Sequence, residues 1–207
     1  QELIFGSFNA INNLIIRLNY YNIIPDDFWL IFKRIIGIKS IDINLIDSNS
    51  HHPLLNTASF FNKIDFVESL LKIESINVNS FDYDTNNTPL LIALERNNLE
   101  IVKLLINCPK TDINILNTFN ESALIIAIKN NQKEIIDLLL NDQRFDPIKS
   151  RLSYGFIFAN NEISKQLYSI NYLDVNQSFL IKIVKGNPKV DINKVKLFLD
   201  SAFNKQP

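Results

Sequence analysis

The chain has 207 residues, of which 46% are hydrophobic and 21% charged, enough for one domain with a buried core or for two small ones. It carries 21 Lys and Arg against 22 Asp and Glu, and this balance excludes strong general attraction to nucleic acid or to an anionic membrane. One cysteine, two histidines and four glycines leave no disulfide framework, no multi-cysteine zinc site and no glycine-rich phosphate loop.

The ends and the hydropathy of the chain set further expectations. No run of about 18 uncharged apolar residues occurs, so we expect no membrane partner. Met is absent and the first residue is Gln1, which suggests a piece of a longer product. Residues 1–16 have neither the charged start nor the small-residue cleavage site of a signal peptide. We therefore expect an intracellular, cytoplasmic chain, with a cytoskeletal location left open.

The N-terminal part has the pattern of a helix pair over residues 5–20 and 25–37. Trp29 lies in an aromatic cluster of the second helix, where we favour a core position and leave a docking patch as the alternative. His51 and His52 follow in a loop. Adjacent residues point in different directions, and no Cys or carboxylate cluster stands at ligand spacing, so this pair predicts no metal or catalytic site.

A short block recurs along the chain. Its copies are Ile41-Asp42-Ile43-Asn44, Ile76-Asn77-Val78-Asn79, Thr111-Asp112-Ile113-Asn114 and Leu173-Asp174-Val175-Asn176, with a weaker copy at Phe145-Asp146-Pro147-Ile148. In chain order, the second residues of the blocks are Asp42, Asn77, Asp112, Asp146 and Asp174. The steps between them are 35, 35, 34 and 28 positions. Each block follows an apolar helical run. The spacing predicts six repeats, over residues 1–41, 42–76, 77–111, 112–145, 146–173 and 174–207.

The third repeat has the clearest helix signals, over residues 86–106. Thr88 is a helix cap, and Pro89 then takes the first helical position, where no amide bond is lost. Leu90, Ala93 and Leu94 recur at helical spacing and face inward, with Ala93 small because two helices approach closely. The fourth repeat carries the same pattern 34 residues later, where Ser122 and Ala123 replace Thr-Pro and predict a weaker helix start.

These two repeats resemble the ankyrin repeat, whose signature is Thr-Pro-Leu-His, Leu-Ala-Ala, Gly-His and a Val-Val-x-Leu-Leu helix. The resemblance is strong over residues 77–146, and moderate over 41–76, where Pro53-Leu54-Leu55 needs a one-residue shift. Over 1–40 and 147–207 it keeps only the second helix and the Asp-x-Asn loop. The family has Gly between its helices and before Thr-Pro, and here Asn stands at each such position. We expect left-handed backbone angles at these residues, because Asn tolerates them best after Gly. They are Asn86, Asn97, Asn120 and Asn131.

Other chemistry-bearing residues have structural explanations. Glu100 and Glu134 recur at helix starts, where a carboxylate favours the helix dipole. Cys108 follows a helix with no histidine within 50 residues, which predicts a partly buried loop thiol. The fifth repeat breaks the consensus with an aromatic run, for which core and docking roles stay open. Its members are Tyr154, Phe156, Phe158, Tyr168 and Tyr172.

The resemblance implies an all-α, ankyrin-type solenoid of about six stacked helix–turn–helix repeats in one domain, 1–207, with degenerate terminal repeats. Its Asn- and Ile-rich style is similar to ankyrin proteins of parasitic protists such as trichomonads. It also implies a non-catalytic scaffold without cofactor or metal, binding a protein through loop tips and first helices. The implied partner-binding residues are Phe81, Asp82, Tyr83, Asp84, Thr85, Asn87, Glu95, Arg96, Leu116, Thr118, Phe119, Glu121, Lys129 and Asn130. Two alternatives stay open: a structural subunit of a large, even cytoskeletal, assembly, and a regulatory or targeting module of a longer enzyme.

Overall fold

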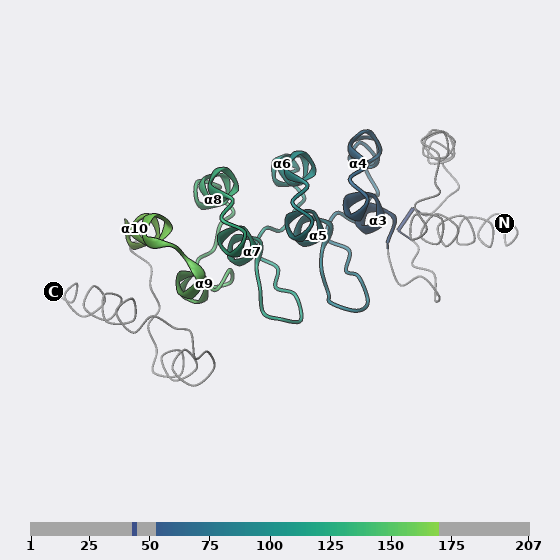
Figure 1. Ribbon diagram of the computed structural model, residues 1–207. Coiled ribbons are helices and arrows are strands. Elements are labelled where there is room, and N and C mark those ends of the chain that lie inside the picture. The colour runs from purple at the N-terminus through teal and green to yellow at the C-terminus, as the bar shows by residue number, and fades with distance from the viewer. Residues whose placement is uncertain (1–42, 45–52, 170–207) are drawn as a thin grey trace, which may run out of the picture. The chain divides into compact units, whose positions relative to one another are not determined.

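The computed structural model describes residues 43–44 and 53–169. The predictions for Trp29, His51, His52 and the first and sixth repeats lie outside these residues. The described part is all α-helix and loop, without a strand. Its helices are α3 (Leu54–Phe60), α4 (Ile64–Leu71), α5 (Pro89–Glu95), α6 (Leu99–Asn107), α7 (Ala123–Lys129), α8 (Lys133–Leu140), α9 (Leu152–Phe158) and α10 (Asn161–Ser169) (Figure 1).

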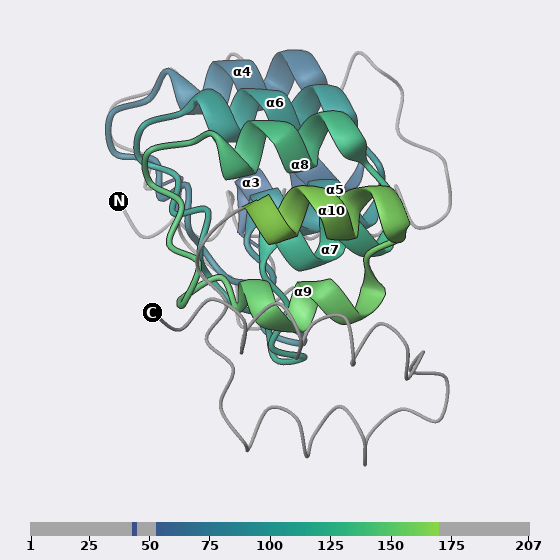
Figure 2. The same cartoon turned by 90° about the vertical axis from the view of Figure 1, so that its left-hand side faces the viewer.

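The helices divide between two compact units. The N-terminal unit spans Gln1–Asp112 and Leu116–Asn120, and the C-terminal unit spans Ile113–Ile115 and Glu121–Pro207. In the N-terminal unit, α3 packs on α5 and α4 packs on α6, so two helix pairs lie side by side in two layers (Figure 2). In the C-terminal unit, α7 packs on both α8 and α9. Each unit therefore contains the helix–turn–helix repeat that the spacing predicts.

Small residues mark the close approach of the first helices. Ala58 and Ala93 occupy equivalent positions of α3 and α5, and both are fully buried, as is Ala127 in α7. Leu90 and Leu94 are also buried on α5, which confirms the inward face predicted for this helix. Because protein interiors are close-packed, a larger side chain at the Ala position would force the helices apart.

The helix starts follow the predicted cap chemistry. The Oγ1 of Thr88 accepts a hydrogen bond from the backbone N–H of Leu91 at 3.4 Å, and Pro89 is the first helical residue. Ser122 caps α7 in the same way, accepting from the N–H of Ile125 at 3.3 Å. Pro53 instead immediately precedes α3, without a side-chain cap. This is the one-residue shift that the sequence predicted for the second repeat.

Left-handed asparagines end the first helices and the hairpin loops. Asn97 and Asn131, between the paired helices, have φ of 58° and 55°. Asn86 lies two residues before the cap Thr88, and Asn120 lies two residues before the cap Ser122. Their φ angles are 54° and 60°. All four predictions are confirmed. Asn62 extends the pattern to the second repeat with φ of 54°, because the turn after α3 needs the same backbone angle.

The fifth repeat departs from the expectation. Only its second helix was predicted to persist, but α9 forms as well, without a Thr-Pro start and after Arg151 at a φ of 52°. Gly155 allows α9 to approach α7, because a Cβ there would come 2.9 Å from the Cδ1 of Ile128. The α9 helix therefore packs closely on α7 although the sequence offers no Thr-Pro start for it.

A polar turn follows α8 in the C-terminal unit. The guanidinium of Arg144 donates to Asp142, with the Nε–Oδ1 distance at 2.9 Å. This side-chain hydrogen bond holds the pKa of Asp142 below its ordinary value, against the opposing effect of burial. The backbone N–H of Arg144 adds a second bond to the same carboxylate at 2.8 Å. Both the backbone and the side chain of Arg144 therefore hold this turn.

In the described part of the chain, the asparagines that end three of the short blocks bond to the next block. Asn79 donates from Nδ2 to the carbonyl of Lys110 at 2.9 Å and accepts at Oδ1 from the N–H of Asp112, also at 2.9 Å. Asn44 makes the same two bonds to Ser75 and Asn77, both at 2.7 Å. We call this series the asparagine ladder.

The ladder has a third member in the C-terminal unit. Asn114 donates to the carbonyl of Arg144 at 2.7 Å and accepts from the N–H of Asp146 at 2.9 Å. The recurring Asp-x-Asn block is thus a set of cross-repeat hydrogen bonds, because each amide side chain satisfies one carbonyl and one N–H of the following loop.

The left-handed turn before α5 gives a first test. We expect Asn86→Ala to lower the free energy of unfolding by about 1 kcal/mol, because Ala pays more than Asn for a left-handed backbone angle. Asn86→Gly should not lower it, since Gly adopts this angle without steric cost. Urea unfolding followed by circular dichroism measures both. Equal losses for the two variants would contradict the conformational explanation.

The ladder gives a second test. We expect Asn79→Ala to lower the free energy of unfolding by about 1 to 2 kcal/mol, since two hydrogen bonds are lost at a partly solvated site. Asn107→Ala is the matched control, because Asn107 is exposed at the end of α6 and Ala suits a helix. Thermal unfolding of both variants decides. The ladder would have no energetic role if the two variants melted at the same temperature.

Candidate functional site

The loop that leads into α5 folds into a hairpin. The N–H of Asp82 donates to the carbonyl of Asn87 at 3.0 Å and closes the loop. One carboxylate oxygen of Asp82 accepts from the N–H and the hydroxyl of Thr85, at 2.7 and 2.8 Å. Tyr83 and Asp84 therefore lie in the turn that these bonds close.

A second loop segment, residues 116–120, lies beside this hairpin within the N-terminal unit. The N–H and hydroxyl of Thr118 both donate to the carbonyl of Thr85, at 2.9 and 3.0 Å. The side chain of Asn117 accepts from the N–H of Phe119 at 3.0 Å. These bonds fix the backbone that carries Phe119 against the tip of the first hairpin.

Three aromatic side chains stand out on these loops. Phe81 is 46% exposed, Phe119 64% and Tyr83 73%, although aromatic residues usually bury most of their surface. The nearby predicted residues Asp84, Glu95, Arg96 and Thr118 are exposed, and Thr85 and Leu116 are half-buried. We call this set the hairpin surface. It comprises Phe81, Tyr83, Asp84, Thr85, Glu95, Arg96, Leu116, Thr118 and Phe119.

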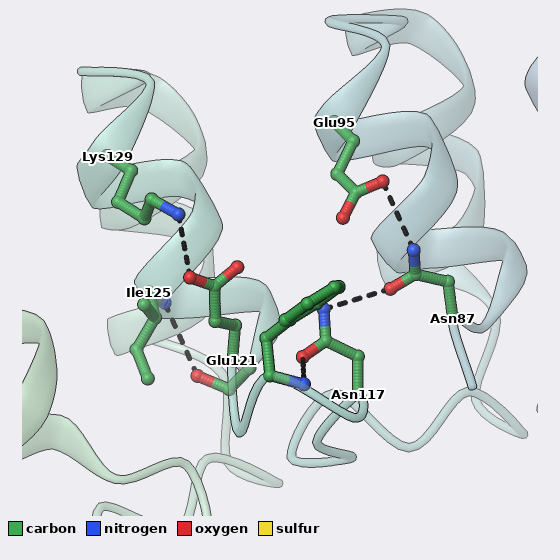
Figure 3. Close-up of polar contacts among 8 residues, drawn as sticks. Asn87, Glu95, Asn117, Glu121, Ile125 and Lys129 are labelled. Atoms are coloured by element: carbon green, nitrogen blue, oxygen red, sulfur yellow. Dashed lines mark hydrogen bonds and ion pairs between the residues drawn. The ribbon is translucent and has the colours of Figure 1, made fainter. Parts of the chain in front are cut away.

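Two of the predicted contact residues, Asp82 and Asn87, are buried beneath the hairpin surface. Asp82 is only 5% exposed and Asn87 only 3%, and the side chains of both support the loop from inside. Asp82 is occupied by Thr85, as described above. The amide of Asn87 donates to the carboxylate of Glu95 and accepts from Asn117, both at 3.1 Å (Figure 3). Sequence position alone placed them on the loop, where burial cannot be seen.

Asn87 also receives a buried bond at its backbone. Asn56, inside α3, donates from Nδ2 to the carbonyl of Asn87 at 3.0 Å and to that of Ser80 at 3.2 Å. The hydroxyl of Ser80 returns a bond to the Oδ1 of Asn56 at 2.8 Å. Asn56 takes the place of Leu91 of the next repeat, so a core position is used to anchor the hairpin. The sequence analysis missed this anchor, although a lone Asn in an apolar helix start is a signal for it.

A similar side-chain bond between loop and helix occurs in the C-terminal unit, but there the helix residue donates and the loop residue accepts. There, the Nζ of Lys129 lies 2.6 Å from the carboxylate of Glu121, at the loop position equivalent to Asn87 (Figure 3). Each pair joins the last residue of a first helix to the loop before that helix, eight positions earlier. Glu121 is half-buried, whereas Lys129 and its neighbour Asn130 are exposed.

An additional exposed aromatic lies at the far end of the first helices. Phe60, at the end of α3, is 39% exposed, and the guanidinium of Arg96 lies 3.5 Å from the centre of its ring. The predicted list contains Arg96 but not Phe60. A cation over a ring is a favourable contact of about 0.5 to 1 kcal/mol at an exposed site. The contact therefore occupies Arg96 within the unit.

The remaining candidates stay structural. Cys108 is a half-buried thiol next to the end of α6, as predicted. Glu100 and Glu134 lie in the first turns of α6 and α8, which confirms the helix-start interpretation. In the fifth repeat, the rings of Tyr154 and Phe158 pack edge to face at 5.5 Å between centres.

Across residues 43–44 and 53–169, no group of three or more His, Cys, Asp or Glu could hold a metal ion. The helices of this part are too short or too polar to cross a bilayer.

The architecture defines the class of protein. Three helix pairs, whose first helices begin at Leu54, Pro89 and Ala123, follow one another at steps of 35 and 34 residues, and a fourth pair begins 29 residues later at Leu152. The family described as ankyrin repeats (3 copies) matches residues 27–117, 54–151 and 98–177. The chain therefore belongs to the ankyrin-repeat family, whose members generally mediate protein–protein interactions. A comparison with curated proteins gave no match.

The reassignment of Asn87 can be tested by stability. We expect Asn87→Ala to lower the free energy of unfolding by about 2 kcal/mol, because the buried amide of Asn117 loses its acceptor and Glu95 loses a donor. Asp84→Asn, on the exposed tip three residues away, should change it by less than about 0.5 kcal/mol. Chemical denaturation of the two variants measures this. A neutral Asn87→Ala would return Asn87 to the list of contact residues.

Proposed function

We propose that this chain is a non-catalytic interaction module that binds a partner protein through the hairpin surface. The support residues Asp82 and Asn87 hold that surface but do not contact the partner. In the C-terminal unit, Glu121, Lys129 and Asn130 present a second stretch of binding surface. They occupy the positions that Asn87, Glu95 and Arg96 have in the preceding repeat. Cys108, the one thiol of the chain, suits a reducing compartment, so we place the module in the cytoplasm.

The observation that carries this proposal is the exposure of Phe81, Tyr83 and Phe119 on loops that are otherwise firmly held. Large aromatic side chains in water are unfavourable, and they are enriched among the residues that dominate binding energy at protein interfaces. Here the hydrogen bonds to Asp82 and Asn117 fix the backbone around them. A surface held in place before binding loses little conformational entropy when a partner arrives, and this favours affinity.

The test is a pull-down from source-cell lysate with the whole chain as bait and mass spectrometry as the readout. We expect the double variant Tyr83→Ala, Phe119→Ala to lose a partner that the unchanged chain retains. Truncating a central aromatic commonly costs at least about 2 kcal/mol of binding, which corresponds to about 30-fold in affinity. Both side chains are mostly exposed, so the variant should stay folded, as circular dichroism will show.

The matched control removes exposed apolar surface elsewhere. Leu138 and Ile148, in the C-terminal unit, are 39% and 56% exposed. The double variant Leu138→Ala, Ile148→Ala should retain the partner. If the two double variants retain the same proteins, the hairpin surface is not the binding site and the proposal fails.

A further inference from the structure

The charges of the described chain are unevenly divided. In the N-terminal unit, residues 53–112 and 116–120 contain eight Asp and Glu but only five Lys and Arg. In the C-terminal unit, residues 113–115 and 121–169 contain six of each. The acidic excess therefore belongs to the unit that carries the hairpin surface, although the whole chain is close to neutral.

The loops of the hairpin surface sharpen this bias. Residues 79–88 and 116–120 contain Asp82 and Asp84 and no Lys, Arg or His. Asp82 is buried against Thr85, but Asp84 is exposed between the tip residues Tyr83 and Thr85. Glu95 is exposed on α5 and accepts a hydrogen bond from the uncharged amide of Asn87 (Figure 3).

The aromatic rings favour the same kind of ligand. The face of a Tyr or Phe ring attracts a guanidinium or ammonium group, and the aliphatic part of Arg or Lys packs on the ring. Within this unit, the contact of Arg96 with the ring of Phe60 shows this arrangement at an exposed aromatic. Tyr83 and Phe119 present more exposed surface than Phe60 does.

We propose that the hairpin surface takes a cationic segment of its partner, with Lys or Arg side chains over Tyr83 and Phe119 and their charges beside Asp84 and Glu95. This inference rests on the proposed function and names the chemistry of the partner. An acidic segment would instead meet like charge, which costs binding energy and rejects the wrong ligand. A neutral apolar segment would use the rings and ignore the carboxylates.

The experiment selects ligands without assuming a sequence. A random dodecapeptide library displayed on phage is panned against the whole chain and, in parallel, against the double variant Tyr83→Ala, Phe119→Ala. Clones recovered only by the unchanged chain define the hairpin-surface ligands. We expect Lys and Arg in these clones to be at least about twofold more frequent than in the input library, and Asp and Glu to be depleted.

Charge variants then test the best clone as a synthetic peptide by fluorescence anisotropy. Asp84→Asn with Glu95→Gln should weaken binding about three- to tenfold, in line with exposed ion pairs, and the loss should shrink at high salt. The control, Asp65→Asn with Glu68→Gln, removes two exposed charges from α4 of the same unit and should leave binding unchanged.

The outcomes separate this inference from the proposed function. If no clone depends on Tyr83 and Phe119, the hairpin surface does not bind peptides and both proposals fall. If clones depend on the aromatics but are acidic or uncharged, or bind the charge-neutral variant equally well, the surface binds a partner of different chemistry. In that case only the cationic segment is overturned.

Discussion

The asparagine ladder is the constraint on which the described repeats depend. A solenoid repeat contacts only its neighbours, so its loops must find their hydrogen bonds in the adjacent repeat. Asn79 does this with one side chain, because its amide both donates and accepts, and it reaches two backbone groups near residue 111. An Asp could accept but not donate. The ladder fixes where each loop begins, and the hairpin that follows starts from a defined position.

The ladder and the repeat pattern weaken at the same place. The N–H of Asp146 still donates to the side chain of Asn114, but Ile148 stands where the earlier blocks have their bonding Asn, and it is 56% exposed. The helix that follows begins after Arg151 at a left-handed angle that neither Gly nor Asn relieves. Local backbone hydrogen bonds accompany this angle: the N–H of Arg151 donates to the carbonyl of Ile148 at 3.1 Å, and the N–H of Leu152 donates to that of Pro147 at 2.9 Å. The fifth repeat thus keeps its first helix although its block lacks the Asn that ends the earlier ones.

The fold was largely predictable because its signals are local. A cap residue such as Thr88 or a left-handed Asn86 acts within a few positions of itself, so the sequence shows both cause and effect. The support of the hairpin surface was not predictable, since it depends on residues that meet only in space. Asn56 and Asn87 are 31 positions apart. Glu121–Lys129 and Asn87–Glu95 share a position but not a charge pattern, so no single motif reveals them.

In the hairpins, different atoms hold the fold and contact a partner: backbone groups accept or donate most of the internal hydrogen bonds, and the tip side chains are left for recognition. Most of their internal bonds end on backbone groups: Thr118 bonds to the carbonyl of Thr85, and Asn117 to the N–H of Phe119. Backbone groups are present whatever the side chain, so the tip residues can change without disturbing these bonds. Tyr83 and Phe119 point their rings into solvent at little cost to the fold. A repeat built in this way can change its partner by changing a few tip residues, because the bonds that hold the tips in place are made elsewhere.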